Sequence, residues 1–385
     1  MEKTSLNELR ERLFQSDELS SFERVCNSIA ACDRVCVFGM GNYGQEVLPF
    51  LKERLGKRLL CVSDNDPSKH GKHFSGLECL NPYELTKYKD DLHIFVAVYM
   101  ANDIINDLFD KGYNVINKQL KRDEVLSYRN WRAKKLYREN WSKIEKVYSL
   151  LSDSKSHDVF IYRLWYNMFP EDFDGIEEPF SEVFSSDQYF PEDIIRLTDR
   201  EVLVDGGAYV GDTIQSFLSR VEMSFKHIYA FELDGDNFLE LNGFIYTLDD
   251  SISKRISTYP CGLWHETQEI SVSGSRSGVH VSNEFDMRSS VCRLNALDEI
   301  LALTQRKTVT YIKMDVEGCE RNAIQGARKV IGASQPKMAI CVYHNPEDIY
   351  EIPLLIHEID LSYKFYIRHH GRDWWYGNET VCYAV

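Results

Sequence analysis

Residues 201–213 read EVLVDGGAYVGDT, and this stretch decides the fold of the larger part of the chain. Its apolar start predicts a β-strand that ends at Asp205, and the small residues Gly206, Gly207 and Ala208 predict a tight turn into a helix. Small residues at the end of a strand let a ligand approach the backbone closely, while the free N–H groups of the following helix point toward that ligand. The stretch therefore predicts a ligand site at a strand end.

The acid of this motif precedes its glycines, which distinguishes it from the G-x-G-x-x-G motif of dinucleotide sites. A ligand with an ammonium and a carboxylate in place of a pyrophosphate suits this order, and we expect Asp205 to lie near the ammonium. The next predicted strand, His227–Glu232, also ends in an acid. A carboxylate at this place can accept the protons of two ribose hydroxyls, so Glu232 is predicted to bind a ribose.

A third acidic turn follows the strongly apolar strand Thr308–Asp315, which reads TVTYIKMD. Ligands of open α/β sheets bind at the carboxyl ends of the strands. We therefore expect Asp315 and Glu317 to face the same crevice as the acids of the two earlier motifs, where four carboxylates would suit a sulfonium cation. Glu320 is expected only to favour the N-terminus of the next helix.

Strands and helices alternate from residue 201 onward, which predicts a mostly parallel sheet with right-handed crossovers. The last two predicted strands, Tyr363–Arg368 and Thr380–Val385, are joined by a short turn-rich stretch and should form an antiparallel hairpin. This α/β arrangement, with only the last strand reversed, resembles the sheet of class I methyltransferases. The remaining strands are predicted at 201–205, 227–232, 256–263, 308–315 and 337–343.

A smaller Rossmann-like α/β domain is predicted near the N-terminus. The strand Asp33–Phe38 leads into a G-x-G-x-x-G motif, and the next strand ends at Asp64, 20 residues after the last glycine of that motif. This is the spacing of a dinucleotide site, so NAD binding is a natural alternative, although no residue set for hydride transfer is evident. The predicted nucleotide site consists of Gly39, Gly41, Gly44 and Asp64.

The stretch between the two domains is basic. Ten Lys or Arg residues and four acids lie from Lys118 to Lys146. An apolar stripe at spacings of three and four predicts a helical connector that packs on one domain, and a phosphate-attracting surface is the alternative. The stripe consists of Tyr137, Trp141, Ile144, Tyr148 and Leu151. The predicted order is a helical segment at 1–29, the small domain at 30–118, a basic helical linker at 119–184 and the larger domain at 185–385.

Composition excludes several classes of protein. The chain has 385 residues, of which 43% are hydrophobic and 27% charged, as in a globular protein rather than a disordered one. A net charge of −15 disfavours a nucleic-acid partner. No apolar run approaches the ~20 residues that cross a bilayer, and the N-terminus lacks an apolar signal core. We therefore expect a cytoplasmic protein without membrane insertion, with ten reduced cysteines. Its oligomeric state, including a homo-oligomer, is left open.

Several stretches resemble the FkbM-family methyltransferases and occur in that family's order over about residues 185–385. They are SSDQYF, EVLVDGGAYVGDT, IYAFELDGDN, RLNALDEIL, YIKMDVEGCE and ETVCYAV. The resemblance implies S-adenosylmethionine-dependent methyl transfer, usually to a hydroxyl oxygen of a sugar, glycan or secondary metabolite. It implies that Asp315 and Glu317 face the acceptor. The predicted cofactor site comprises Asp205, Gly206, Gly207, Ala208, Gly211, Asp212, Thr213, Glu232 and Asn237.

Methyl transfer to a hydroxyl needs a base, because a protonated alcohol is a poor nucleophile. Asp315 and His344 are the candidates, and with Glu317 they form the predicted catalytic set. The ordinary pKa of histidine, about 6.5, suits proton removal at neutral pH, but His344 could equally cap a turn. Asp315 and Glu317 are also ligands of the kind that Mg²⁺ uses, yet two carboxylates suit a sulfonium alone, so no metal is predicted.

The N-terminal stretches VFGMGNYGQEV and VSDNDPSKHGKHFSGLECLNPYEL resemble the Rossmann-like domains of bacterial sugar-modifying enzymes, which contact nucleotide sugars. The leading hypothesis is a sugar O-methyltransferase of bacterial surface-glycan or related biosynthesis, whose acceptor is a small molecule or glycan, free or nucleotide-linked. An NAD-dependent oxidoreductase and a non-catalytic binding protein are the alternatives. Contacts to the acceptor are expected from Gly274–Ser290 and from the region 150–190.

Overall fold

The computed structural model describes residues 4–15, 21–98, 101–120, 125, 127–174, 176, 178, 180–273, 280–282, 290–303, 308–371 and 378–385. The chain divides into two compact units, and their boundary falls inside helix α6 (Tyr128–Glu139). Among the described residues, the larger unit comprises residues 4–13, 133–282 and 290–385, and the smaller unit comprises residues 14–132.

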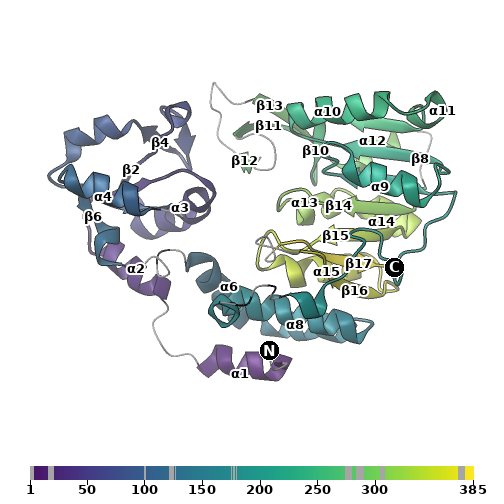
Figure 1. The fold of residues 1–385 in the computed structure, drawn as a ribbon, viewed down its shortest axis with the longest axis horizontal. Coiled ribbons are helices and arrows are strands. Elements are labelled where there is room, and N and C mark those ends of the chain that lie inside the picture. The colour runs from purple at the N-terminus through teal and green to yellow at the C-terminus, as the bar shows by residue number, and fades with distance from the viewer. Residues whose placement is uncertain are drawn as a thin grey trace. The chain divides into compact units, whose positions relative to one another are not determined.

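A seven-stranded sheet forms the centre of the larger unit (Figure 1). Its order is β16-β17-β15-β14-β7-β8-β9, and every neighbouring pair is parallel except the two pairs that include β17. The prediction of a mostly parallel sheet with one reversed strand is therefore confirmed. The strands are β7 (Val202–Gly206), β8 (His227–Phe231), β9 (Ile256–Tyr259), β14 (Tyr311–Met314), β15 (Lys337–Cys341), β16 (Phe365–His369) and β17 (Thr380–Ala384).

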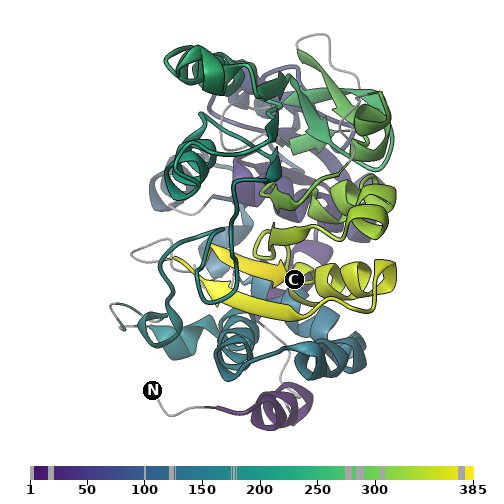
Figure 2. The same ribbon diagram turned by 90° about the vertical axis from the view of Figure 1, so that its right-hand side faces the viewer.

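Helices cover both faces of this sheet, because its strands bury alternate side chains in two separate apolar cores. Figure 2 shows the teal helices α9 and α10 on one side of the sheet and the yellow-green helices on the other. The first face carries α9 (Asp212–Arg220), α10 (Gly235–Tyr246) and α11 (Asp250–Ser253). The apolar core on the second side includes side chains of α1 (Leu6–Gln15), α7 (Trp141–Leu150), α8 (Ser154–Met168), α12 (Leu297–Ala302), α13 (Glu320–Gln325), α14 (Arg328–Ser334) and α15 (Asp348–Ile359).

The predicted linker is part of the larger unit from residue 133 onward. Its apolar stripe packs in the core of the second face, where Tyr137, Trp141 and Ile144 are buried. The Asp153 carboxylate caps α8 by accepting the Ser156 N–H at 2.7 Å. These helices therefore pack in the core of the larger unit.

The predicted strand at 256–263 is wrong in one respect, because it is two strands in two sheets. Pro260 stands between β9 and β10 (Cys261–Leu263), and a proline has no N–H to continue the ladder of hydrogen bonds. β10 joins a four-stranded sheet of order β10-β13-β11-β12, which the sequence did not predict. The other strands of this sheet are β11 (Gln268–Ser273), β12 (His280–Ser282) and β13 (Ser290–Asn295).

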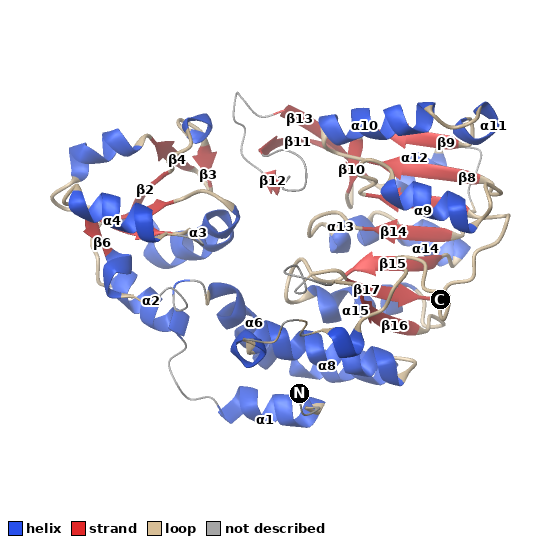
Figure 3. Cartoon of the chain, viewed as in Figure 1, coloured by secondary structure: helices blue, strands red, loops and turns tan. Residues whose placement is uncertain are grey.

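The smaller unit is an α/β domain, as predicted. Its sheet has the order β3-β4-β2-β1-β5-β6 and is parallel apart from the short hairpin of β3 and β4. Figure 3 shows helices flanking its strands. The elements are α2 (Ser21–Ala30), β1 (Val35–Phe38), α3 (Asn42–Leu55), β2 (Leu59–Ser63), β3 (His73–Phe74), β4 (Leu77–Leu80), β5 (His93–Val96), α4 (Asn102–Asp110) and β6 (Asn114–Val115).

All ten cysteines lie in described segments, and no disulfide bond joins any two of them. A search of the described segments for a helix long and apolar enough to span a bilayer finds none.

Candidate active site

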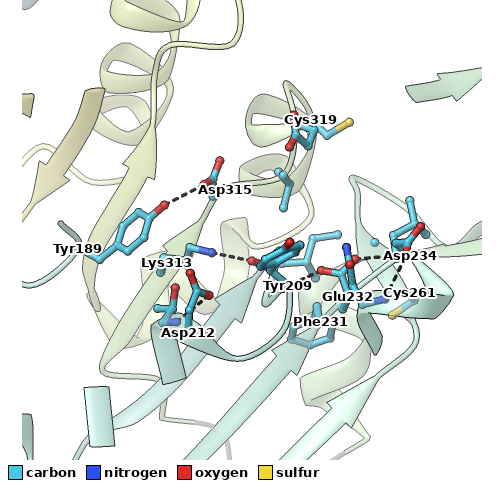
Figure 4. A pocket seen from close by; sticks show the side chains of 18 of the residues that line it. Tyr189, Tyr209, Asp212, Phe231, Glu232, Asp234, Cys261, Lys313, Asp315 and Cys319 are labelled. Atoms are coloured by element: carbon cyan, nitrogen blue, oxygen red, sulfur yellow. Dashed lines mark hydrogen bonds between the residues drawn. The ribbon is translucent and has the colours of Figure 1, made fainter. Parts of the chain in front are cut away.

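A pocket of about 370 Å³ opens at the carboxyl ends of β7, β8 and β14, which are neighbours in the sheet (Figure 4). The sheet order therefore brings together residues that are more than a hundred positions apart in the sequence. Seven residues of the predicted site line this pocket, namely Gly207, Asp212, Thr213, Glu232, Asn237, Asp315 and Glu317. Five predicted residues do not line it, namely Asp205, Gly206, Ala208, Gly211 and His344.

Glu232 stands at one end of the pocket with its carboxylate fixed by backbone donors. The N–H groups of Tyr209 and Asp234 each donate to one of its oxygens at 2.8 Å. Burial raises the pKa of Glu232, and these two hydrogen bonds oppose that shift. Each oxygen keeps a lone pair for a ligand, so the carboxylate remains able to accept the two hydroxyl protons of a ribose.

Gly207 fixes how closely β7 approaches β14 at the floor of the pocket. Its φ is +73°, a left-handed conformation that favours glycine, and a Cβ at this position would overlap the carbonyl oxygen of Asp315. No larger residue fits here without moving the two strand ends apart. The glycine of the DGGA motif is therefore required for the shape of the pocket.

Asp205 lies beneath the pocket instead of lining it. Its fully buried carboxylate is 3.1 Å from the Lys313 ammonium, which also donates to the Gly207 carbonyl oxygen at 2.7 Å. Burial raises the pKa of Asp205 and Lys313 opposes that shift. This arrangement differs from the expectation that Asp205 lies near a ligand's ammonium. The Asp205 carboxylate pairs with Lys313, and Lys313 in turn holds the glycine turn.

Asp315 lies at the other end of the pocket and accepts hydrogen bonds from two phenol hydroxyls. The hydroxyls of Tyr189 and Tyr343 donate to it at 2.8 and 3.2 Å, and the first of these bonds is drawn in Figure 4. Burial works to raise the pKa of Asp315, but Lys313 and His344 outweigh it and hold the pKa below its ordinary value. Asp315 is therefore an oriented anion that suits a cationic ligand better than it suits the role of a base.

Backbone strain concentrates around this pocket. Four described residues of its lining have positive φ without being glycine, namely Tyr189 (+69°), Tyr209 (+48°), Glu317 (+53°) and Glu379 (+58°). Such conformations cost about 1–3 kcal/mol each and persist where the surrounding structure enforces them, commonly at functional sites. At Tyr189 the enforcement is visible, because its N–H donates to the Tyr383 hydroxyl at 3.0 Å and its carbonyl oxygen accepts from the Tyr311 hydroxyl.

His344 lies behind the pocket wall among carboxylates. Its Nδ1 is 3.0 Å from Glu320 Oε1, and its Nε2 is 3.5 Å from Asp315 and 3.6 Å from Glu317. Burial lowers the pKa of His344, but the three carboxylates outweigh burial and raise it to about 9. The three carboxylates favour the protonated ring, which differs from the ordinary histidine pKa that we expected, and the assignment of His344 as a base stays a prediction.

Glu317 is a partly exposed carboxylate of the pocket lining. Its side chain is 45% exposed, and burial together with neighbouring carboxylates raises its pKa to about 7. The sequence analysis named Glu317 but not two further residues of the lining. Gln188, whose side chain donates to Glu379, and Glu379 itself line the pocket, and their only signal in the sequence was their place in the stretches SSDQYF and ETVCYAV. The predicted acceptor stretch Gly274–Ser290 lies largely outside the described residues.

The predicted nucleotide site of the smaller unit forms a pocket of about 260 Å³ that Gly39, Gly41 and Asp64 line. Gly44 lies below it, where a Cβ would overlap the Gly39 carbonyl oxygen. Asp64 accepts the Met40 and Asp66 N–H groups at 2.6 and 2.8 Å and pairs with Lys69 at 2.9 Å. Its carboxylate is thus already paired with a cation, and ligand binding at this pocket stays a prediction.

His370 links two segments of the larger unit, because each nitrogen of its ring makes a hydrogen bond. Its Nδ1 is 2.8 Å from the Ser185 carbonyl oxygen and its Nε2 is 2.9 Å from the Tyr383 hydroxyl, which also accepts the Tyr189 N–H. A neutral ring satisfies both contacts by donating from Nδ1 and accepting at Nε2. Burial lowers the pKa of His370 to about 4, and the cations Lys155 and Arg368 add to this effect.

We expect His370 to make the protein less stable in mild acid. An unfolded chain binds the proton near pH 6.5 and the folded chain only near pH 4, so stability is full above about pH 6.5 and falls as the pH drops toward 4, by at most about 3 kcal/mol. Urea unfolding of the intact chain and of His370→Gln at pH 7.5, 6 and 5 measures this. The free energy of unfolding of the variant should fall less than that of the intact chain between pH 7.5 and 5. Equal losses would show that His370 is not the group responsible.

The order of the seven-stranded sheet, with a pocket at the ends of β7, β8 and β14, defines a class I methyltransferase fold. Within that class, residues 205–367 match the family model described as the methyltransferase FkbM domain. This part of the chain is therefore an FkbM methyltransferase domain, which confirms the resemblance inferred from the sequence.

Solved structures support the fold over a longer stretch. The methyltransferase FkbM from Methylobacillus flagellatus is similar with a TM-score of 0.56 and 21% identity, over 98% of this chain and 99% of that chain. An rRNA methylase from Streptococcus thermophilus has a TM-score of 0.30 and 13% identity, over 49% of this chain and 87% of that one. Aeropyrum pernix fibrillarin, solved with bound S-adenosyl-L-methionine, has a TM-score of 0.29 and 14% identity, over 50% of this chain and 71% of that one. At TM-scores below 0.5 the last two likenesses carry no further conclusion. No curated protein is significantly similar in sequence.

Proposed function

We propose that this methyltransferase uses S-adenosylmethionine to methylate a hydroxyl oxygen of a sugar or glycan. The observation that carries the proposal is a single pocket with a ribose-type acid, Glu232, at one end and an oriented anion, Asp315, at the other. When bound, S-adenosylmethionine supplies a methyl group on a cationic sulfur. The residues of the pocket fit two parts of this cofactor, because Glu232 can accept hydrogen bonds from the ribose hydroxyls and Asp315 can face the sulfonium.

Glu317 is the proposed base. It lines the pocket and is partly exposed there, whereas Asp315 is occupied by two phenol hydroxyls and His344 lies behind the wall. A base must come within hydrogen-bonding reach of the proton that it removes, and a partly exposed carboxylate of the pocket lining meets this requirement. We therefore assign proton removal to Glu317, and to Asp315 the orientation of the sulfonium where the cofactor meets the acceptor.

The chemistry of the acceptor end favours a polyhydroxyl compound. Gln188, Tyr189, Tyr343 and Glu379 surround it with an amide, two phenols and a carboxylate. Hydrogen-bonding groups of this kind match sugar hydroxyls, and carboxylates here disfavour a phosphate close to the methylated position. The proposal therefore places any nucleotide-linked phosphate of the acceptor away from this end. With the resemblance of the chain, it also favours a role in bacterial surface-glycan biosynthesis in the cytoplasm.

Transfer of a labelled methyl group tests the reaction. The intact chain is incubated with methyl-labelled S-adenosylmethionine and a panel of neutral sugars, oligosaccharides and nucleotide sugars, and label in the acceptor is measured. We expect base-stable ether-linked label in a sugar. Label in no hydroxyl acceptor, together with turnover of NADH by the same preparation, would favour the oxidoreductase alternative at Gly39 to Asp64.

Glu232→Gln is expected to weaken the binding of S-adenosylhomocysteine about 10- to 100-fold, because one charge-assisted hydrogen bond to ribose is worth about 1.5–3 kcal/mol. Turnover at saturating cofactor should change much less. Calorimetric titration measures the affinity, and Glu240→Gln on the exposed side of α10 is the matched control, which should bind within about 2-fold of the intact chain. Equal affinity of both variants would remove Glu232 from the ribose site.

A further inference from the structure

A cluster of titratable side chains lies directly behind the acceptor end of the pocket, and two of its members have no role in the proposed function. Asp315 follows β14, His344 follows β15, and Glu320 begins α13. One ligand atom from each of these three residues lies within 4.8 Å of the other two. The sheet therefore brings two carboxylates and an imidazole to one point from three separate segments.

Glu320 is the unusual member of the cluster. Its side chain is fully buried, and the oxygen Oε1 accepts the Val316 N–H at 2.9 Å and faces His344 at 3.0 Å. The other oxygen, Oε2, is buried without a hydrogen-bond partner among the described residues. A buried carboxylate oxygen is costly to leave unsatisfied, so this atom points to a missing partner.

Charge balance indicates the kind of partner. Asp315, Glu317 and Glu320 all lie within 3.6 Å of the imidazole of His344, so three carboxylates share one ring. Two nearby cations pair with other carboxylates, because Lys313 is 3.1 Å from Asp205, and Arg321 is 3.3 and 3.2 Å from Glu347 and Asp348. A cation with more than one positive charge would compensate the cluster better than a single imidazolium does.

We propose that Asp315, Glu320 and His344 form a binding site for one divalent transition-metal ion, such as Mn²⁺ or Zn²⁺. Carboxylate oxygens combined with a neutral imidazole nitrogen, which His344 offers once the ion displaces its proton, are the ligands of these ions, whereas Mg²⁺ and Ca²⁺ prefer oxygen ligands alone. Glu317 stands on the pocket side of the site, 3.6 Å from His344 Nε2. This proposal replaces two earlier expectations, that no metal binds and that Glu320 serves only a helix N-terminus.

The role of the ion rests on the proposed function. Asp315 faces the pocket as well as the cluster, so an ion held there lies at the end of the pocket that receives the acceptor. A bound divalent ion can orient an acceptor hydroxyl and make its proton easier to remove, and Glu317 is close enough to take that proton. The binding site itself can be tested without any acceptor or cofactor.

The test uses the full chain after dialysis against EDTA and is a titration with Mn²⁺, followed by the loss of the free-ion electron paramagnetic resonance signal. We expect one Mn²⁺ per chain, displaced by Zn²⁺, and an affinity at least 10-fold lower in Glu320→Gln and in His344→Asn. Glu379→Gln removes a charge from the same pocket outside the cluster, so it should bind Mn²⁺ within about 3-fold of the intact chain. Thermal unfolding curves of all variants without metal confirm that each is folded.

Two results would overturn the proposal. One is the absence of saturable Mn²⁺ and Zn²⁺ binding at millimolar concentration. The other is binding that Glu379→Gln weakens as much as Glu320→Gln does, which would indicate attraction to a generally acidic pocket. If no metal binds but the EDTA-treated chain still transfers methyl groups, the metal site is wrong and the proposed function stands. If the metal binds but no methyl group is transferred, the metal site stands and the proposed function is wrong.

Discussion

Replacing Glu317 by glutamine should lower the turnover number about 10²- to 10⁴-fold, the usual contribution of a positioned base. The affinity for S-adenosylhomocysteine should change less than about 3-fold, because the substitution keeps the size of the side chain and lies at the acceptor end of the pocket. Single-turnover methyl transfer and calorimetric titration of the same preparation measure the two quantities. The separation of the two effects is what assigns Glu317 to proton removal.

Glu222→Gln is the matched control for this variant. Glu222 is also a glutamate with a positive φ, +48° against +53° for Glu317, but it is exposed and does not line the pocket. Its substitution should leave turnover within about 2-fold of the intact chain. If Glu317→Gln keeps nearly full turnover, the base is another group, and the assignment made from the geometry of the pocket is wrong.

The substitution Gly207→Ala should abolish cofactor binding, with affinity reduced at least about 100-fold. A Cβ would overlap the Asp315 carbonyl oxygen, and the backbone is in the left-handed region. The strand ends must separate to make room for the side-chain methyl group of alanine. This separation displaces Asp315 and the glycine turn that Lys313 holds. Left-handed strain and overpacking together cost about 2–5 kcal/mol of the free energy of unfolding.

Gly243→Ala distinguishes this effect from that of any glycine substitution. Gly243 lies inside α10, where a Cβ would meet no atom within 4 Å. Alanine there should stabilise the helix by about 0.5–1 kcal/mol and leave cofactor affinity unchanged. Urea unfolding and calorimetric titration compare the two variants. Normal affinity in Gly207→Ala would show that the close approach of β7 and β14 is not required for the pocket.

The sequence predicted the central sheet because its information is local. Each of the motifs at Asp205, Glu232 and Asp315 combines an apolar run with an acid at the strand end, and the parallel order then places these ends at one edge. The four-stranded sheet of β10 to β13 escaped prediction, since its pairing joins distant short segments whose patterns are weak. The break at Pro260 was readable in the sequence, because proline ends a ladder of hydrogen bonds.

The candidate site was predicted in part for the same reason. Residues whose role depends on the backbone turn, such as Gly207 and Glu232, occupy the places that the motifs indicate. Roles set by tertiary neighbours were not readable. Three carboxylates from other segments favour the protonated form of His344, and Asp205 pairs with Lys313 beneath the pocket. Electrostatic partners of this kind follow from packing, which the local pattern does not encode.

Calorimetric titration of the intact chain with S-adenosylhomocysteine tests the central claim most directly. We predict one binding site per chain. Binding should be lost in Gly207→Ala and unchanged in Asp64→Asn of the smaller unit. The absence of binding to the intact chain, or binding that Asp64→Asn removes and Gly207→Ala retains, would contradict the account. The second of these results would place the cofactor in the smaller unit, at the pocket that Gly39 and Asp64 line.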